Sequence, residues 1–209
     1  MWMWIACALL VAAYLLGSLS GSLLLGRLRG VDIRTLGSGN AGGTNALRTQ
    51  GWRFALGVVL VDVGKGALAA WLATRVMPGP THATWIFAAV LAAVAGHVWP
   101  VFHGFRGGKG AATLVGGLAV AWPQALVPVL AVWAVCLVLT GYVGLSTVLA
   151  GLALAAYAAF PTDAVRFGFG LVAAALLVYT HRGNLQRLRA GTEPRFERAR
   201  LFHRARRPT

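Results

Sequence analysis

Three short polar segments of the sequence combine glycines with cations, hydroxyls and amides, which are the groups that bind phosphate. The first segment, 37–48, is rich in glycine and ends in an arginine. Glycines permit left-handed turns in which backbone N–H groups converge on an anion. An arginine adds a planar, permanently charged fork that suits phosphate. The pattern therefore favours a phosphate site over a plain hydrophilic loop. The candidates are Gly37, Ser38, Gly39, Asn40, Gly42, Thr44, Asn45 and Arg48.

The same segment satisfies the dinucleotide-binding pattern G-x-G-x-x-G at Gly37, Gly39 and Gly42. That pattern has meaning only at a strand-to-helix turn within a βαβ unit. Here it lies between two apolar runs that are long enough to cross a membrane. The sequence therefore excludes a nicotinamide dinucleotide at this position.

The second segment, 97–110, contains Lys109 between glycines. A Walker A loop would need glycine at position 103 and serine or threonine at position 110, but the chain has His103 and Gly110. ATP binding by that motif is excluded. A lysine at the start of a helix still favours an anion, because N–H groups and the positive end of the helix dipole face it. The alternative to an anion site is an ordinary cytoplasmic turn, in which basic residues are common. The candidates are His97, Gly107, Gly108, Lys109 and Gly110.

The third segment, 181–193, begins where the last apolar run ends. His181 and Asn184 lie three residues apart, so one helical turn presents both side chains together. A basic flank that ends a membrane span is the simpler explanation, but it requires neither the asparagine nor the Gly-Thr-Glu ending. Ser146, at the start of another apolar run, is either a site residue or a serine that packs helices.

Asp62 and Lys65 lie three residues apart inside an apolar run, where pairing lowers the cost of burying either charge. Ionisable groups within a membrane span are functional candidates. An ion pair that braces the helices is the alternative.

The elements that must position these residues are membrane helices. Hydrophobic residues make up 58% of the 209 residues and charged residues only 11%, and the mean hydropathy is +0.70. A soluble domain carries about 25% charged residues, because its surface faces water. The composition therefore predicts an all-α integral membrane protein.

Lysines and arginines outnumber acidic residues by 19 to 5, which gives a formal net charge of +14. They lie in clusters between apolar runs, as in cytoplasmic loops, so the sequence argues against nucleic acid as a partner. Cys7 and Cys136 each lie inside an apolar run without the spacing of a metal site or a disulfide. No metal or other cofactor is expected.

The sidedness of charge sets the number of spans. Basic clusters follow the first, third and last apolar runs, so an odd number of spans places all three in the cytoplasm. The uncharged stretch 111–160 is too long for one crossing and holds three, although twelve residues in the first are too few for the full hydrocarbon core. A single domain over 1–209 with about seven transmembrane helices follows, with the N-terminus outside and a basic cytoplasmic tail over 182–209. The predicted spans are 2–25, 54–74, 83–102, 111–122, 125–140, 143–160 and 164–181.

Together these segments resemble the bacterial glycerol-3-phosphate acyltransferases that use acyl phosphate, the PlsY family, over almost the whole chain. Several motifs in their proper order make the resemblance specific. They are Gly37-Ser38-Gly39-Asn40, Thr44-Asn45, Arg48, Asp62-Val63-Gly64-Lys65-Gly66, Gly96-His97, Phe105 to Gly110, His181-Arg182-Gly183-Asn184 and Gly191-Thr192-Glu193.

The resemblance implies transfer of a fatty acyl group from acyl phosphate to the 1-hydroxyl of sn-glycerol 3-phosphate, giving lysophosphatidic acid and phosphate for phospholipid synthesis. It implies a multi-pass protein of the bacterial plasma membrane with its site at the cytoplasmic face. The implied catalytic residues are Ser38, Arg48, Lys109, His181 and Asn184. Ser38, Thr44, Lys109, His181 and Asn184 would hold the acyl phosphate. Arg48, Lys109 and Asn45 would contact glycerol 3-phosphate, with His97 and Ser146 in support. The base is either His181 or the donor phosphate itself.

Other readings of the sequence are weaker. Acyltransferases that use acyl-CoA carry an aspartate five residues after a histidine, but the residues at that position are Phe87, Phe102, Gly108, Gln186 and Pro208. A CDP-alcohol transferase would need clustered aspartates, and the three here are widely separated. A phosphate or organophosphate transporter is the main alternative, but it predicts paired repeats and a polar path across the membrane. The sequence has no such repeat, and no pattern in it indicates an oligomeric state.

Overall fold

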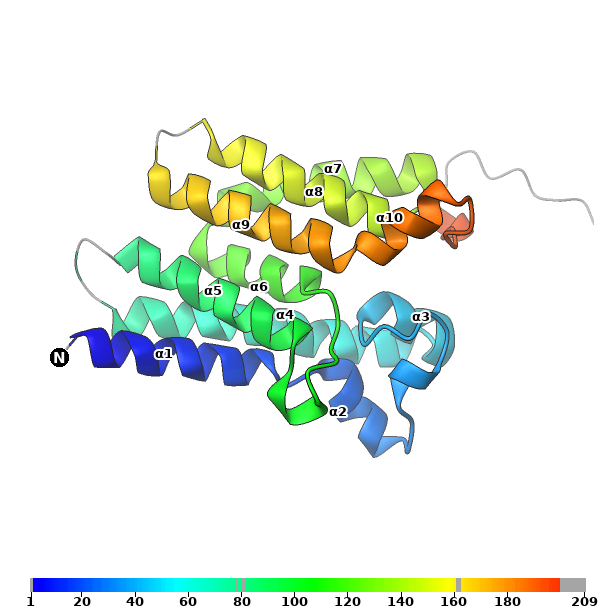
Figure 1. The fold of residues 1–209 in the computed structure, drawn as a ribbon, viewed down its shortest axis with the longest axis horizontal. Helices are drawn as coiled ribbons and strands as arrows, with labels where there is room; N and C mark the ends of the chain where they lie inside the picture. Colours follow the sequence, from blue (N-terminus) through cyan, green and yellow to red (C-terminus); the bar gives the residue numbers. More distant parts are fainter. Residues whose placement is uncertain (1, 78, 80–81, 161–162, 200–209) are drawn as a thin grey trace, which may run out of the picture.

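A computed structural model describes residues 2–77, 79, 82–160 and 163–199, and within these the chain forms helices and no strands. The helices of 11 or more residues run alongside one another (Figure 1). They are α1 (Trp2–Gly17), α4 (Trp52–Val76), α5 (His82–Val98), α6 (Ala111–Ala121), α7 (Leu126–Thr140), α8 (Val143–Ala158) and α9 (Ala164–Thr180). Three further helices have eight residues each: α2 (Gly21–Leu28), α3 (Gly43–Gln50) and α10 (Arg182–Arg189).

Successive long helices run in opposite directions, so the chain turns at two ends of the bundle. The N-terminus lies at one end, on the left in Figure 1. At the other end lie α2, α3, the segment 99–110, the turn at 141–142 and α10. All three segments that the sequence marks for phosphate therefore meet at one end of the molecule.

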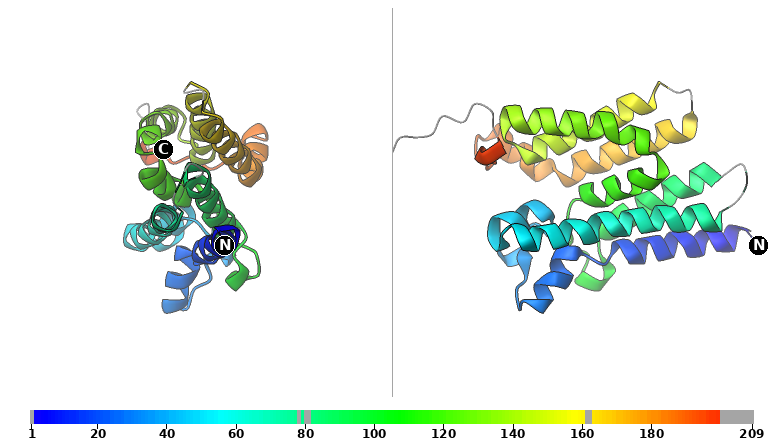
Figure 2. Two further views of the ribbon diagram at one scale, coloured as in Figure 1. Left: turned by 90° about the vertical axis from the view of Figure 1, so that its left-hand side faces the viewer. Right: turned by 180° about the vertical axis from the view of Figure 1, so that it is seen from behind.

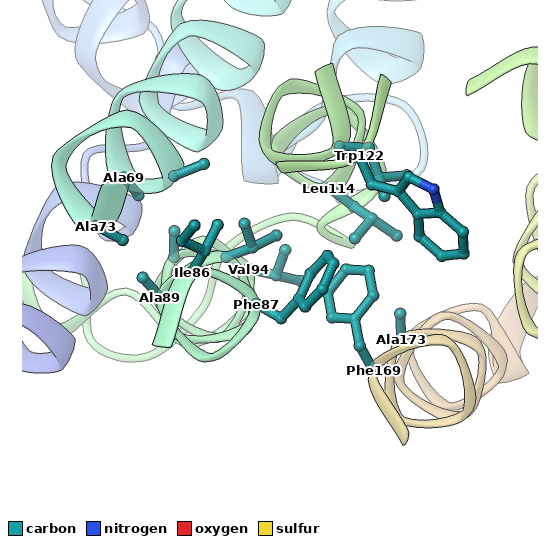
Figure 3. Packing of buried hydrophobic residues seen from close by; sticks show 14 of the residues in the cluster. Ala69, Ala73, Ile86, Phe87, Ala89, Val94, Leu114, Trp122, Phe169 and Ala173 are labelled. Atoms are coloured by element: carbon teal, nitrogen blue, oxygen red, sulfur yellow. The ribbon is translucent and has the colours of Figure 1, made fainter. Parts of the chain in front are cut away.

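The long helices form two packed groups, as both views in Figure 2 show. One group contains α1, α4, α5 and α6, and the other contains α7, α8 and α9. Contacts of α5 with α9 and of α6 with α7 join the groups. Aromatic rings contribute to this junction, because Phe87 of α5 stacks on Phe169 of α9 with ring centroids 4.5 Å apart, and Trp122 meets Phe87 edge-on (Figure 3).

Glycines let helix backbones approach closely within the first group. A Cβ on Gly66 of α4 would overlap the Thr113 carbonyl of α6, and a Cβ on Gly116 would overlap the Val63 carbonyl in return. Small residues at helix interfaces are typical of membrane bundles, where close backbone contact replaces the hydrophobic effect. The pair α4 and α6 therefore depends on glycine from both sides.

Within the part of the chain that the structure describes, three helical segments are long and apolar enough to cross a membrane, and the number rises to five if each of two bent pairs is one span. The three are Trp52–Val76, His82–His103 and Pro123–Thr140. The bent pairs are α1 with α2 and α9 with α10. The helices α6 and α8 are apolar but shorter. The total of seven crossings and the outward N-terminus stay predictions.

The predicted bounds of five spans fall within two residues of the helix ends. These are 54–74, 111–122, 125–140, 143–160 and 164–181, which correspond to α4, α6, α7, α8 and α9. The predicted span 83–102 differs at its end, because α5 stops at Val98. Pro100 lacks a backbone N–H and disfavours helix in the residue before it.

The predicted span over 2–25 is bent and is not one continuous helix. The structure breaks it at residues 18–20, and α1 and α2 meet at 47°. Polar side chains of α4 stabilise the break, because Lys65 Nζ donates to the Leu19 carbonyl and Asp62 Oδ1 accepts from the Gly21 N–H. Side-chain partners from outside the helix replace part of its hydrogen-bond ladder there.

The C-terminal region also differs from the predicted tail over 182–209. Residues 182–189 form α10, which meets α9 at 55°. The following residues fold back on the bundle, since Phe196 N donates to the Gly141 carbonyl and Arg195 Nε donates to Tyr142 Oη. The predicted tail beyond residue 199 lies outside the described residues.

Candidate active site

Asn45 shapes the glycine-rich segment from within. Its amide nitrogen donates to the Ile33 and Leu36 carbonyls at 3.1 and 2.9 Å, and its oxygen accepts from Ser38 N at 3.0 Å. The side chain is fully buried at the start of α3. Because both N–H groups of Asn45 are used on the loop backbone, the structure gives this residue a bracing role rather than an open contact surface.

Two glycines of this segment adopt a left-handed backbone conformation. Gly37 has φ +57° and Gly39 has φ +70°. A Cβ on Gly37 would also overlap Asn45 Oδ1, so only glycine fits there. Ser38 lies between the two glycines and is exposed at the end of the bundle, while Thr44 is half-buried in the first turn of α3. The turn thus presents Ser38 outward on a backbone that Asn45 fixes.

The lysine segment packs directly against the glycine-rich segment. Gly108 N donates to the His97 carbonyl at 3.1 Å. A Cβ on Gly108 would overlap His97 Nε2 and would lie 2.8 Å from the Ala41 carbonyl. Gly110, at φ +87°, then turns the chain into α6. Gly108 is therefore the point where the first two segments meet.

Arg34, which precedes the glycine-rich segment, holds the lysine segment next to it. Sequence patterns did not single out this residue. Its NH1 group donates to the carbonyls of His103 and Arg106 at 2.9 and 3.3 Å. Its other nitrogens pair with Asp32, with a closest approach of 2.8 Å. The hydrogen bond from the Arg34 guanidinium lowers the pKa of Asp32 to about 2. The only signal in the sequence was Asp-x-Arg spacing among other basic loop residues.

A polar chain joins Lys109 to the third segment. Lys109 Nζ donates to Asn184 Oδ1, and Asn184 Nδ2 donates to Glu193 Oε1 at 2.6 Å. Glu193 in turn accepts from Arg187 Nε at 2.8 Å. This chain connects the two groups of helices, because Lys109 precedes α6 and Asn184 belongs to α10. Glu193, which was noted only as part of a motif, orients Asn184.

Burial, together with the neighbouring charge of Arg187, lowers the pKa of Lys109 to about 8. A half-buried cation with one neutral hydrogen-bond acceptor has unused capacity for an anion. A phosphate group at Lys109 would supply the missing counter-charge.

His181 lies between α9 and α10, close to the Lys109 backbone. Its Nδ1 lies 2.8 Å from the Leu177 carbonyl, which can only accept, so Nδ1 carries the hydrogen and Nε2 carries the lone pair. Thr180 Oγ1 donates to the Lys109 carbonyl at 3.1 Å. The end of α9 therefore holds His181 and Lys109 in one corner.

Arg48 approaches the third segment from α3, since its NH2 group donates to the Pro194 carbonyl at 3.3 Å. Ser146 is fully buried, and its hydroxyl donates to the Tyr142 carbonyl one helical turn earlier. That bond is typical of a serine that packs helices. The neighbouring Gly144 lies against Asn184, where a Cβ would come within 2.7 Å of the asparagine.

The structure thus brings candidates from three distant segments to one end of the bundle. Arg48, Lys109, His181 and Asn184 lie where the segments converge, and Ser38 and Thr44 lie on the adjoining loop. His97 lies behind Gly108, and Asn45 and Ser146 are engaged by the backbone. The fold and this cluster define a class: a helical protein with membrane-length apolar helices and a glycine-rich, cationic cluster at one end.

Comparison with known proteins identifies the family. Residues 7–191 match the family described as glycerol-3-phosphate acyltransferase. The chain belongs to this family, which includes PlsY.

Relatives and solved structures agree with this assignment. The glycerol-3-phosphate acyltransferase of Gloeobacter violaceus is 44% identical, over 91% of this chain and 95% of the relative. That of Myxococcus xanthus is 42% identical, over 90% and 98%. The crystal structure of PlsY (YgiH), an integral membrane glycerol 3-phosphate acyltransferase, in its glycerol 3-phosphate form is 34% identical and covers 91% of this chain and 95% of its own, with a TM-score of 0.85. Its lysophosphatidic acid form gives a TM-score of 0.82 over the same shares.

Proposed function

We propose that the protein is a membrane acyltransferase that moves a fatty acyl group from acyl phosphate to the 1-hydroxyl of sn-glycerol 3-phosphate. The family name and the two ligand forms of the PlsY structure support the acceptor and the product. The observation that carries the proposal is the convergence of Lys109, Arg48 and a glycine-rich turn at one end of the bundle. Both substrates carry phosphate, so the reaction needs such groups in one place.

In this reaction the glycerol hydroxyl oxygen attacks the acyl carbon, and the bond between that carbon and the phosphate oxygen breaks. Phosphate leaves with the bonding electrons, and the hydroxyl proton ends on it. Acyl phosphate is already activated, so catalysis consists largely of positioning and charge stabilisation. Lys109 would stabilise the negative charge that builds up on the leaving phosphate, and Asn184 would hold the Lys109 side chain.

His181 is proposed to orient the acceptor hydroxyl rather than to keep its proton. The lone pair on Nε2 can accept a hydrogen bond from that hydroxyl, because Nδ1 is engaged with the Leu177 carbonyl. The leaving phosphate takes the proton in the same step. In this substrate-assisted route His181 increases the rate of acyl transfer, but the reaction does not depend on it entirely.

The acyl chain is proposed to come from the bilayer, so the site belongs at the membrane surface. The basic residues at the same end of the bundle favour the cytoplasmic face of a bacterial plasma membrane. The proposed phosphate-binding residues then lie at the membrane surface, next to the apolar helices.

The donor is tested with purified protein in lipid nanodiscs, supplied with glycerol 3-phosphate and either palmitoyl phosphate or palmitoyl-CoA. Mass spectrometry should detect 1-palmitoyl-glycerol 3-phosphate from palmitoyl phosphate alone. Product formed from palmitoyl-CoA at a similar rate would overturn the proposed donor. No product from either donor, with uptake of glycerol 3-phosphate into vesicles, would indicate the transporter instead.

A further inference from the structure

A second cluster of ionisable side chains lies inside the bundle, apart from the residues around Lys109. Asp62 and Lys65 of α4 and His97 of α5 are each at most 4% exposed. Burying a charge is costly unless it is paired and fully hydrogen-bonded. The contacts of this cluster show what it holds in place.

All three N–H donors of the Lys65 ammonium group are used. Nζ lies 3.0 Å from the Leu19 carbonyl, 3.0 Å from Asp62 Oδ1 and 2.8 Å from His97 Nδ1. An ammonium group has no lone pair, so His97 Nδ1 must be the acceptor. His97 Nδ1 lies 3.4 Å from Asp62 Oδ1, a longer contact than the one to Lys65. In neutral His97 the hydrogen is therefore on Nε2.

The Nε2 end of His97 faces the point where the first two phosphate segments meet. A Cβ on Gly108 would overlap Nε2 and would also come close to the Ala41 carbonyl. Only a glycine at position 108 fits beside this edge of the ring. The Nε2–H donor thus points toward the junction of the glycine-rich turn and the lysine segment.

We propose that Asp62 and Lys65 are positioning residues that act through His97. Lys65 fixes the tautomer of His97, and Asp62 neutralises Lys65 and holds the Gly21 N–H at the break between α1 and α2. His97 Nε2–H then donates to the phosphate group of a bound substrate at the junction. This inference rests on the proposed function. Glycerol 3-phosphate and acyl phosphate share the recognised group, so both are tested.

The test is a double-mutant cycle on KM, measured separately for glycerol 3-phosphate and for palmitoyl phosphate. Lys65→Met should raise KM for one of them by about 10- to 100-fold, the effect of losing a hydrogen bond to a charged group. His97→Ala should raise the same KM. Lys65→Met added to His97→Ala should raise it little further, because Lys65 acts only through the ring. The arm that responds identifies which phosphate His97 contacts.

Two further variants separate positioning from support of the fold. His97→Gln keeps an N–H close to the position of Nε2 and should retain a KM much nearer to that of the wild type than His97→Ala does. Thr113→Val serves as the control, since Thr113 is fully buried in the same helix group and its hydroxyl has no hydrogen-bond partner among the described residues. It should leave KM unchanged.

The inference is wrong if the Lys65 and His97 effects on KM are additive, or if Lys65→Met lowers only the melting temperature. If Lys65→Met does not fold, Asp62→Asn replaces it in the same cycle, because it removes the charge that Lys65 faces and keeps an oxygen for Gly21. An inactive wild-type enzyme would refute the proposed function itself. If the wild type is active and the Lys65 variant has a normal KM, only the positioning role of Lys65 is refuted.

Discussion

Lys109 is a cation whose surroundings disfavour its own charge, and this predicts an alkaline limit to activity. Because burial lowers the pKa of Lys109 to about 8, the free enzyme loses this cation as pH rises through about 8 rather than near 10.5. The profile of kcat/KM against pH reports groups of the free enzyme and should fall above that point. Both substrate phosphates are fully ionised there, since a phosphate loses its second proton near pH 6.

A kcat/KM that stays level to pH 10 would contradict this assignment. The lowered pKa of Lys109 also makes the free energy of unfolding depend on pH. Between pH 8 and 10.5 the unfolded lysine binds more protons than the folded one, so the contribution of Lys109 to the free energy of unfolding rises with pH in that range. Activity and this contribution should therefore change in opposite directions.

His181 tests which group takes the proton. His181→Ala should lower kcat by about 10- to 100-fold, the effect of losing one orienting hydrogen bond. The remaining activity should keep the pH profile of the wild type, because the phosphate still accepts the proton. A loss of 10⁴-fold or more would instead make His181 the general base. Steady-state phosphate release measured from pH 5.5 to 9 distinguishes the two.

At the scale of elements, the start of α8 supports the site through Gly144. Gly144→Ala would place a methyl group within 2.7–2.8 Å of Asn184 Cβ, Cγ and Nδ2 and would push Asn184 away from Lys109. We expect kcat/KM to fall by about tenfold or more, as for a displaced catalytic hydrogen bond. The melting temperature should change little, because alanine stabilises a helix by about 1 kcal/mol relative to glycine, and this gain offsets the cost of displacing Asn184.

Gly168→Ala in α9 is the matched control, since a Cβ there meets nothing within 4 Å. It should leave kcat/KM unchanged and slightly raise the melting temperature. Equal activity in both variants would show that the contact between α8 and Asn184 does not matter for turnover.

The sequence predicts the elements well where one physical signal dominates. Apolar length places α4, α6, α7, α8 and α9 to within two residues, because burial in lipid requires continuous apolar helices. The break between α1 and α2 could not be predicted from local sequence. It depends on Asp62 and Lys65, which lie about forty residues further along the chain.

The sequence predicts which candidate residues gather at one end of the bundle, but not which contacts hold them there. Types of side chain identified Lys109, His181 and Asn184, which the structure brings together with Arg48. Residue type could not reveal which groups would be spent on the backbone, as Asn45 and Ser146 are. Nor could it single out Arg34 and Glu193, because their roles exist only after distant segments meet.

For the whole molecule, we predict that the three polar segments lie on one side of the membrane and the turns after α4, α6 and α8 on the other. A protein in which Cys7 and Cys136 are replaced by alanine provides the background. Ser38→Cys should react with a membrane-impermeant maleimide only from the cytoplasmic side, and Gln124→Cys only from the outside. Intact and inverted membrane vesicles give the two exposures. Labelling of both positions from the same side would refute the three crossings predicted between them.

The converging segments are proposed to form one acyl-phosphate-dependent site. The most direct measurement is phosphate release from palmitoyl phosphate by the purified protein in nanodiscs, with and without glycerol 3-phosphate. Lys109→Ala serves as the blank. We predict release that requires glycerol 3-phosphate, matches the acylated product mole for mole and is abolished in Lys109→Ala. Absence of release from well-folded wild-type protein, or equal release by the Lys109 variant, would contradict it.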